Sequence, residues 1–256
     1  MMAKRYWISF QTIYIREMMR VLRLWSQTLL PSAITTLLYF VIFGKLIGSR
    51  IGSMNGISYI DYIAPGLIMM TIINNTYASA SMFYMTKFTR AIEEILVSPT
   101  PLWVVLWGYV GGSVTRGLMA GLIVYGIALF FGGIYFHHLI VLFLIALLSA
   151  TLFGLAGFLN GQLAKSFDGI SFMPTFVLTP LTYLGGVFYS INLLPAFWVH
   201  ASLLNPVLYM VNGFRYGFLG VSDINIGFAF GLLILCNVLL YGVCFYFLRK
   251  GTGIKT

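Results

Sequence analysis

Long apolar runs constrain the fold of this 256-residue chain more than any other feature. A helix that crosses the hydrocarbon core of a membrane needs about 20 consecutive, mostly apolar residues. Six stretches meet this requirement, approximately residues 26–48, 60–83, 103–132, 139–163, 170–189 and 226–248. Only 8% of the residues are charged, too few to cover the surface of a soluble domain. The sequence therefore predicts an all-α polytopic membrane protein, a single domain over residues 1–256 with six transmembrane helices.

The distribution of Lys and Arg predicts the orientation of these spans. With six spans both ends of the chain lie on one side of the membrane, and cytoplasmic loops carry an excess of basic residues. Eleven Lys and Arg fall on the side of the termini, Arg116 lies inside the third span, and the opposite side receives only Lys45, Arg50 and Arg215. We therefore expect both termini in the cytoplasm. The formal charge of +9 is largely an orientation signal, and we expect no nucleic-acid partner.

Residues 4–24, before the first span, have the pattern of an amphipathic helix. Aromatic and apolar side chains recur at near-helical spacing, and arginines form a separate basic set. Such a helix lies in the interface between lipid and water. It is either a plain membrane anchor or a collar that also touches a partner protein. The side chains that we expect to define this interfacial helix are Trp7, Tyr14, Arg16 and Arg20.

Residues 84–101, on the cytoplasmic side, contain a short charged helix that ends at Ser98-Pro99. Two of the six acidic residues of the chain lie here, and Arg90 and Glu94 have the spacing of an ion pair on one helix face. The loop is either a solvated connection or a docking helix for a cytosolic partner. Its apolar stripe consists of Phe88, Ile92, Ile95 and Leu96.

Residues 190–225, on the opposite side, are too long for a tight turn and too apolar for a mobile loop. Pro195 and Pro206 interrupt them, so we expect short helices that re-enter the outer leaflet, where protein or water must surround the irregular backbone.

In the fifth span, Pro174 and Pro180 bend the helix. This bent span either lines a path or packs as an ordinary helix.

Arg116 is costly within a span unless it faces protein or water. It is either a snorkelling or structurally paired arginine, or a residue of a translocation surface or a subunit seam. The glycines around it suit close helix packing.

Several chemistries are excluded or disfavoured by missing groups. A nucleotide hydrolase needs a G-x-x-x-x-G-K-[ST] loop, but the step Gly44-Lys45 is followed by Leu46. The three histidines, of which His137 and His138 are adjacent, give neither a metal site nor a catalytic set, so we expect no catalytic residues and no metal. A membrane-embedded lipid enzyme would need convergent polar groups in a cleft. An ion-coupled secondary transporter normally keeps carboxylates near the midplane. It remains the alternative function.

Three motifs carry a resemblance to a known family. The first is the acidic pair Glu93-Glu94 followed by Ser98-Pro99. The second runs from Pro180 through the Gly-Gly-Val-Phe-Tyr sequence at 185–189 to Pro195. The third is the segment 204–215, which contains Leu-Asn-Pro and ends in Gly-Phe-Arg. In this order, with six spans, they resemble the type-2 ABC transporter permeases, and among these the bacterial inner-membrane members.

This resemblance implies a homodimer in the bacterial inner membrane, bound to two copies of a cytosolic ATP-binding subunit. It implies ATP and Mg in that subunit and no cofactor in this chain, and it implies export of a lipid, glycan or drug-like amphiphile. Membrane lipids are further partners. The coupling residues would be Lys87, Phe88, Arg90, Ile92, Glu93, Glu94 and Leu96. Candidates for the translocation path or dimer seam are Arg116, Phe172, Phe176, Thr179 and Tyr183. The outer motif comprises Asn205, Pro206 and Arg215.

Overall fold

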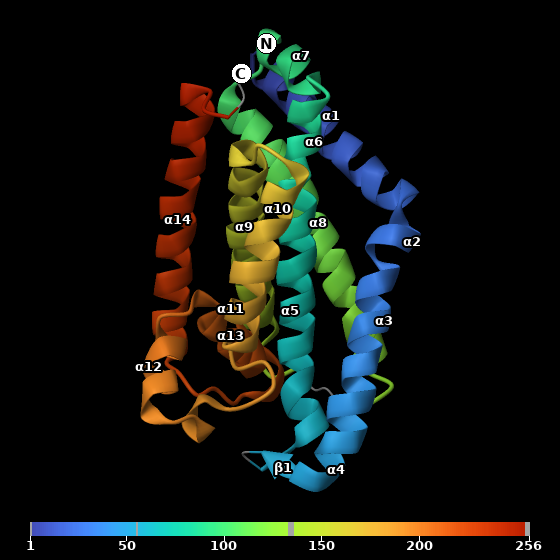
Figure 1. The fold of residues 1–256 in the computed structure, drawn as a ribbon, viewed down its shortest axis with the longest axis vertical. Coiled ribbons are helices and arrows are strands. Elements are labelled where there is room, and N and C mark those ends of the chain that lie inside the picture. The colour runs from blue at the N-terminus through green and yellow to red at the C-terminus, as the bar shows by residue number, and fades with distance from the viewer. Residues whose placement is uncertain (1, 55, 133–135, 254–256) are drawn as a thin grey trace.

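The computed structural model describes residues 2–54, 56–132 and 136–253 as an elongated bundle of helices (Figure 1). The helices in chain order are α1 (Met2–Arg23), α2 (Trp25–Thr28), α3 (Leu30–Tyr39), η1 (Phe40–Ile47), α4 (Gly48–Ile51), α5 (Tyr59–Ser81), α6 (Phe83–Phe88), α7 (Ala91–Val97), α8 (Leu102–Ala128), α9 (Leu139–Leu163), α10 (Phe167–Met173), η2 (Pro174–Leu178), α11 (Thr179–Tyr183), η3 (Ile191–Leu193), α12 (Ala196–Leu203), α13 (Pro206–Leu219) and α14 (Ile226–Lys250). The sequence did not predict the small antiparallel hairpin of β1 (Ser53–Met54) and β2 (Ile57–Ser58).

Four helical segments in the described part of the chain are long and apolar enough to cross a membrane. They are Trp25–Ile51, which joins α2, α3, η1 and α4, and the single helices α8, α9 and α14. The all-α, multi-pass class predicted from the sequence is therefore confirmed. The second predicted span overlaps α5. The fifth, predicted at 170–189, overlaps the consecutive segments α10, η2 and α11, which end at Tyr183.

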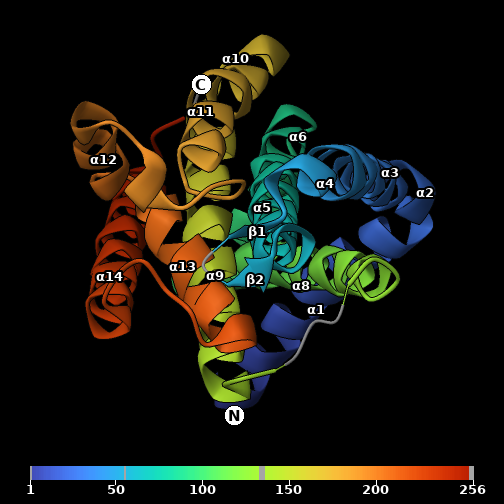
Figure 2. The same ribbon diagram turned by 90° about the horizontal axis from the view of Figure 1, so that it is seen from below.

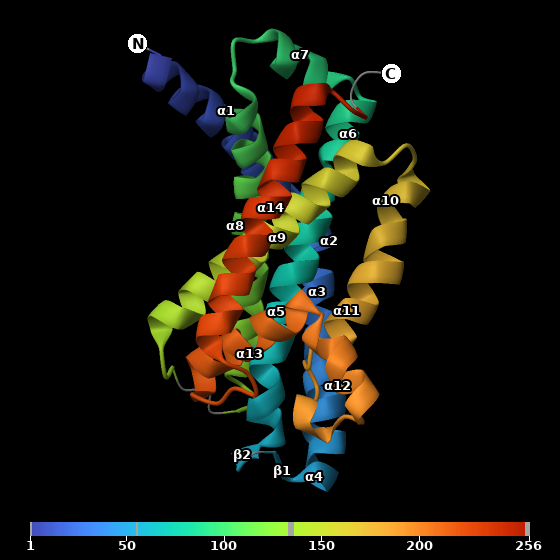
Figure 3. The ribbon, with the colours of Figure 1, turned by 90° about the vertical axis from the view of Figure 1, so that its left-hand side faces the viewer.

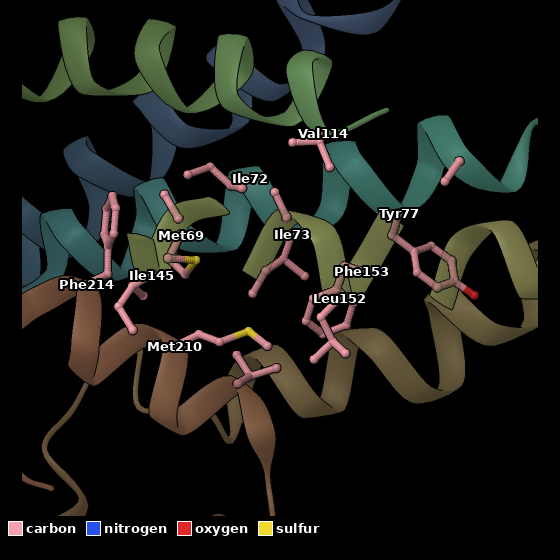
Figure 4. Packing of buried hydrophobic residues seen from close by; sticks show 14 of the residues in the cluster. Met69, Ile72, Ile73, Tyr77, Val114, Ile145, Leu152, Phe153, Met210 and Phe214 are labelled. Carbon is pink, nitrogen blue, oxygen red and sulfur yellow. The ribbon is translucent and has the colours of Figure 1, made fainter. Parts of the chain in front are cut away.

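The helix α5 forms the centre of the bundle, with α3 on one side and α13 and α14 on the other (Figure 2). Its most extensive contacts are with α8 and α9. Buried apolar side chains of α5, among them Met69 and Ile73, meet Ile145 of α9 and Met210 of α13 in the core (Figure 4). The core therefore lies around α5, whereas α14 and the α10–α11 segment pack at the outside.

Glycines set the spacing of the central helices. A Cβ atom on Gly117 of α8 would collide with the Thr76 hydroxyl of α5, and one on Gly157 of α9 would collide with the Tyr77 carbonyl oxygen. A Cβ atom on Gly112 would lie 2.7 Å from Cβ of Glu17 in α1. Small residues thus let backbones approach closely, and these glycine-lined surfaces contact other helices of the same chain.

The α10–α11 segment contains a π-helical stretch that begins at Pro174. Proline lacks the N–H that would bond the carbonyl four residues earlier, and that carbonyl, on Ile170, accepts a hydrogen bond of 3.0 Å from the Asn160 side chain instead. The Thr179 hydroxyl donates to the Pro174 carbonyl at 3.0 Å. The predicted distortion at this proline is therefore present, and α9 stabilises it from outside.

Candidate functional site

The first and last residues that the structure describes lie at the same end of the bundle as α6 and α7 (Figure 1). We call residues 83–97 the α6–α7 loop. Its helix is interrupted because Arg90 has a φ of 59°, in the left-handed region. Arg90 therefore precedes α7 instead of sharing a face with Glu94, and the described residues contain no ion pair between the two. The predicted i, i+4 pair is wrong for this reason.

Lys87 attaches the α6–α7 loop to the end of α9. Its Nζ atom donates to the Gln162 carbonyl at 2.9 Å and to the Ala164 carbonyl at 2.5 Å, and it lies 5.1 Å from the ring centroid of Tyr84. These carbonyls belong to the last turn of a helix, where no intrahelical donor is available. Burial lowers the pKa of Lys87. A residue predicted to contact a partner is thus engaged within the chain.

A cavity of about 620 Å³ lies under this loop. Ile92 is buried in its wall, whereas Phe88, Glu93 and Glu94 are exposed. The Leu96 side chain lies outside the described part of the structure. We call this space the loop cavity; its lining is Tyr84, Lys87, Phe88, Arg90, Ile92, Glu93, Leu163, Ala164, Lys165, Thr252 and Gly253.

Thr252 and Gly253 also line the loop cavity, which no pattern in the sequence indicated. The Gln162 side chain donates to the Thr252 carbonyl at 3.1 Å. Gly253 has a φ of +77°, and a Cβ atom there would collide with the Gln162 carbonyl oxygen. Glycine is the residue that adopts this conformation without strain. The segment after α14 is therefore held against the same end of α9 that Lys87 caps.

A second cavity, of about 330 Å³, lies between α3, α5 and α11. Its lining contains hydroxyl and amide side chains but no Lys, Arg, Asp, Glu or His. We call it the polar cavity. It is lined by Pro31, Ser32, Thr35, Thr36, Tyr39, Leu67, Met70, Thr71, Asn74, Asn75, Thr179, Thr182 and Tyr183.

Hydrogen bonds across the polar cavity connect α3 to both neighbouring helices. The Asn75 amide donates to the Ser32 hydroxyl at 3.0 Å, and the Thr36 and Thr71 hydroxyls are 3.2 Å apart. At one end the Tyr39 and Tyr183 hydroxyls are 3.2 Å apart. Such contacts can be exchanged for contacts to a polar, uncharged ligand, because each group can donate as well as accept.

The predicted path residues divide into two places. Thr179 and Tyr183 line the polar cavity. Phe172 and Phe176 lie on the same α10–α11 segment; their rings are tilted by 33° with centroids 4.9 Å apart, and both are exposed. Figure 3 shows this segment along one side of the bundle. Arg116 lies elsewhere, on α8. Sequence reasoning missed the polar groups of α3 and α5, although Asn74-Asn75 in an apolar run was a usable signal.

Arg116 is beside the α1 helix. Glu17 of α1 is buried and pairs with Arg20 at 2.5 Å. Burial raises the pKa of Glu17, while attraction to Arg20, Arg16 and Arg116 acts in the opposite direction. The Nε atom of Arg116 is buried and has no hydrogen-bond partner in the described part of the chain. Three arginines are therefore grouped around one carboxylate.

Two of the predicted interfacial residues, Tyr14 and Arg16, connect α1 to α8. The Tyr14 hydroxyl is 2.8 Å from that of Thr115, and Arg16 donates to the Tyr109 hydroxyl. Trp7 is exposed and stacks on Phe10.

The predicted outer motif holds α13 in place at the opposite end of the bundle. Asn205 caps this helix, since its Oδ1 accepts from the Val207 N–H at 2.9 Å, and Pro206 occupies the first helical position, which suits its fixed φ and missing N–H. Arg215 is completely enclosed: its guanidinium donates to the Gly186 carbonyl at 2.7 Å and lies 4.0 Å from the Tyr62 ring centroid. Arg215 is thus part of the interior and not a loop charge.

Comparisons with known proteins agree with the predicted resemblance. The family model of the ABC-2 type transporter matches residues 8–219. The chain is 52% identical over 256 residues to the inner membrane transport permease YadH of Escherichia coli (strain K12), with 100% of both chains covered. It is 22% identical over 232 residues to nodulation protein J of Rhizobium meliloti (strain 1021), which covers 88% of each chain. It is 24% identical over 236 residues to nodulation protein J of Rhizobium leguminosarum bv. viciae, which covers 88% of this chain and 90% of that protein.

The resemblance predicted from three sequence motifs is therefore confirmed. Members of this family are transport permeases and not enzymes, and they typically work with an ATP-binding subunit. The apolar helices fit a multi-pass protein of the inner membrane. Because the family model matches residues 8–219 and a relative 52% identical covers the full length, this chain belongs to the ABC-2 type transporter family, as a membrane-embedded transport permease.

Proposed function

We propose that this chain is the membrane subunit of an exporter driven by a separate ATPase, with six spans and both termini in the cytoplasm. A homodimer would bind two ATP-binding subunits that hold ATP and Mg. The observation that supports this best is the α6–α7 loop, which presents exposed Phe88, Glu93 and Glu94 above a cavity at the end of the bundle that carries both described chain ends. A docked ATPase would contact these side chains.

The attachment of the loop supports a mechanical role. Movement of a docked ATPase would press on α7, and Lys87 would transmit that movement to the end of α9 through its two hydrogen bonds to carbonyl oxygens. Because α9 packs along α5, the displacement would reach the helices around the polar cavity. A rigid-body shift of packed helices is a known form of alternating access.

Reversing the charge of Glu94 tests the docking role. We expect Glu94→Lys to reduce co-purification of the ATP-binding subunit and to reduce coupled ATP turnover at least tenfold, because the variant loses a charge contact to that subunit. Arg50→Glu, an exposed charge reversal at the opposite end, is the control. Unchanged assembly and turnover in Glu94→Lys would contradict the docking role. Transport that persists without the ATPase but collapses with the proton gradient would favour an ion-coupled carrier.

The polar cavity supports an uncharged polar group as the transported headgroup. A charged headgroup at this depth would need an opposite charge, and the lining has none. Hydroxyl and amide side chains instead match the hydroxyls of a glycan or of a neutral lipid headgroup, and the exposed rings of Phe172 and Phe176 offer an apolar surface on the same α10–α11 segment that carries Thr179 and Tyr183.

Removing one polar group from this cavity should therefore lower transport selectively. We expect Asn75→Leu to reduce uptake of a fluorescent amphiphile with a neutral, hydroxyl-rich headgroup into inverted vesicles by roughly three- to tenfold, the effect of one hydrogen bond of about 0.5–1.5 kcal/mol. Asn237→Leu, on α14 and away from the cavity, serves as the control. Equal loss for amphiphiles with neutral and cationic headgroups would argue against recognition by this cavity.

A further inference from the structure

The elbow between α1 and α2 forms a basic cavity that the transport function does not use. Arg16, Arg20 and Arg23 are spaced by four and three residues, so they lie on one face of α1. With Met19 and Leu24 they line a cavity of about 330 Å³. Figure 1 shows that α1 runs obliquely at the end of the bundle and turns at this point toward α3. We call this space the elbow cavity.

The charges around the elbow cavity do not balance. Arg16, Arg20 and Arg116 all interact with Glu17, Arg23 belongs to the same cavity, and Glu17 is the acidic residue of the group. Four positive charges thus face one negative charge. The C-terminal dipole of α1 contributes the equivalent of roughly half a negative charge, which leaves more than two positive charges uncompensated beside an apolar bundle. An anion at this place would stabilise the arrangement.

Donor groups remain free to bind such an anion. A guanidinium has five N–H donors. Arg16 uses one on the Tyr109 hydroxyl, and Arg20 uses its Nη2 on Glu17 and on the Ser79 carbonyl. Within the part of the chain that the structure describes, the Arg23 guanidinium makes neither a hydrogen bond nor an ion pair, and the Arg116 Nε is buried without a partner.

The surroundings identify the anion by its chemistry. Arginine binds phosphate oxygens in bidentate geometry, and the spacing of the three arginines along α1 suits a phosphodiester. Exposed apolar side chains flank the cavity, with Leu22 at 52% and Trp25 at 57% exposure. Trp25 begins the apolar segment Trp25–Ile51, which is long enough to cross a membrane, so acyl chains would cover these side chains, and the phosphate nearest to the arginines would be that of a phospholipid. We propose that the elbow cavity binds the phosphate headgroup of an acidic phospholipid.

Retention of lipid by the purified full-length chain tests this assignment. The probes are short-chain phosphatidylglycerol and phosphatidylcholine, titrated against the detergent-solubilised protein and counted as bound adducts by native mass spectrometry. We expect the native chain to prefer phosphatidylglycerol, and Arg23→Gln to weaken that binding about tenfold, equivalent to about 1.4 kcal/mol. Because Arg23 makes no internal bond, this variant should fold normally. Arg50→Gln, an exposed arginine at the opposite end of the bundle, should bind as the native chain does.

Two further arms separate the sources of phosphate and test the charge argument. Inorganic phosphate in large excess should fail to displace phosphatidylglycerol, because it lacks acyl chains; full displacement would assign the cavity to a free anion and overturn the proposal. Glu17→Gln should strengthen binding, because it removes the carboxylate that competes for Arg20. Equal affinity of the native chain and Arg23→Gln for phosphatidylglycerol would also overturn it. None of these measurements involves the ATPase, so their outcome is independent of the proposed transport function.

Discussion

Replacement of Arg215 by methionine should destabilise the protein by about 3–5 kcal/mol, the usual cost of removing one partner from a buried polar and ionic network. The side chain is 1% exposed. Its guanidinium donates to the Gly186 carbonyl and, at 3.4 Å each, to the Tyr62 carbonyl and to Asn212 Oδ1. Methionine has a similar length but no donor, so the Gly186 carbonyl would lose this partner, and Asn212 Oδ1 would keep only the bond from the Asp223 N–H.

Replacement of Arg215 would also destabilise the neighbouring carboxylate of Asp223. Asp223 accepts from the Ser190 hydroxyl at 2.9 Å and from the Tyr62 hydroxyl at 3.4 Å, and its own N–H donates to Asn212 Oδ1 at 3.1 Å. Without Arg215, no positive charge in the described part of this network would compensate Asp223. We therefore expect the segment around η3 and α13 to loosen from α5 before the rest of the bundle unfolds.

Thermal unfolding in detergent measures this effect. We expect the apparent melting temperature of Arg215→Met to fall on the order of 10 °C, and proteolysis to begin between α11 and α14. Arg50→Met, which removes an exposed arginine, should unfold within a degree or two of the native chain. A melting temperature for Arg215→Met that matches this control would show that the network contributes little.

The second large effect is expected at Gly157, where α9 meets α5. A Cβ atom there would collide with the Tyr77 carbonyl oxygen and lie 3.0 Å from Cβ of Ala80. Backbone atoms cannot rotate away as a side chain can, so Gly157→Ala must push the two helices apart. Overpacking of this kind costs typically 1–3 kcal/mol and sometimes more, despite the better helix propensity of alanine.

A second glycine provides a matched control for this substitution. Gly231 lies within α14, and a Cβ atom there has no neighbour within 4 Å. Gly231→Ala should leave stability unchanged or raise it by up to about 1 kcal/mol. Equal melting temperatures for the two alanine variants would contradict the close approach of α9 and α5.

Prediction from the sequence succeeded where a single physical property decides the structure. The apolar run at residues 139–163 corresponds to α9 at both bounds, and the run at 226–248 to most of α14, because hydrophobic length alone defines such a helix. It failed at Arg90. A left-handed residue that is neither glycine nor asparagine has no local signature, and here the tertiary contacts of Lys87 and Ile92 impose the break.

The polar cavity was harder to predict for a different reason. The residues of the polar cavity come from three segments that are distant in the chain, and each hydroxyl taken alone resembles the serines and threonines that bond their own helix, as Thr71 does with the Leu67 carbonyl. Only the packing of α3 against α5 places Ser32 opposite Asn75. The residue pattern within one helix therefore cannot distinguish polar side chains that line a cavity from polar side chains that bond the backbone of their own helix.

The polar cavity also has a genetic consequence. If the chain forms the proposed homodimer with a two-fold axis, and if the polar cavity lines its transport path, a single codon change would alter two walls of that path at once, so no point mutation would produce a one-sided pore. Co-expression of an Asn75→Leu chain with a native chain would create mixed assemblies with one intact wall. If both walls must bind the transported molecule at the same time, the variant should be dominant over the native allele. If each wall binds it independently, transport activity should follow gene dosage.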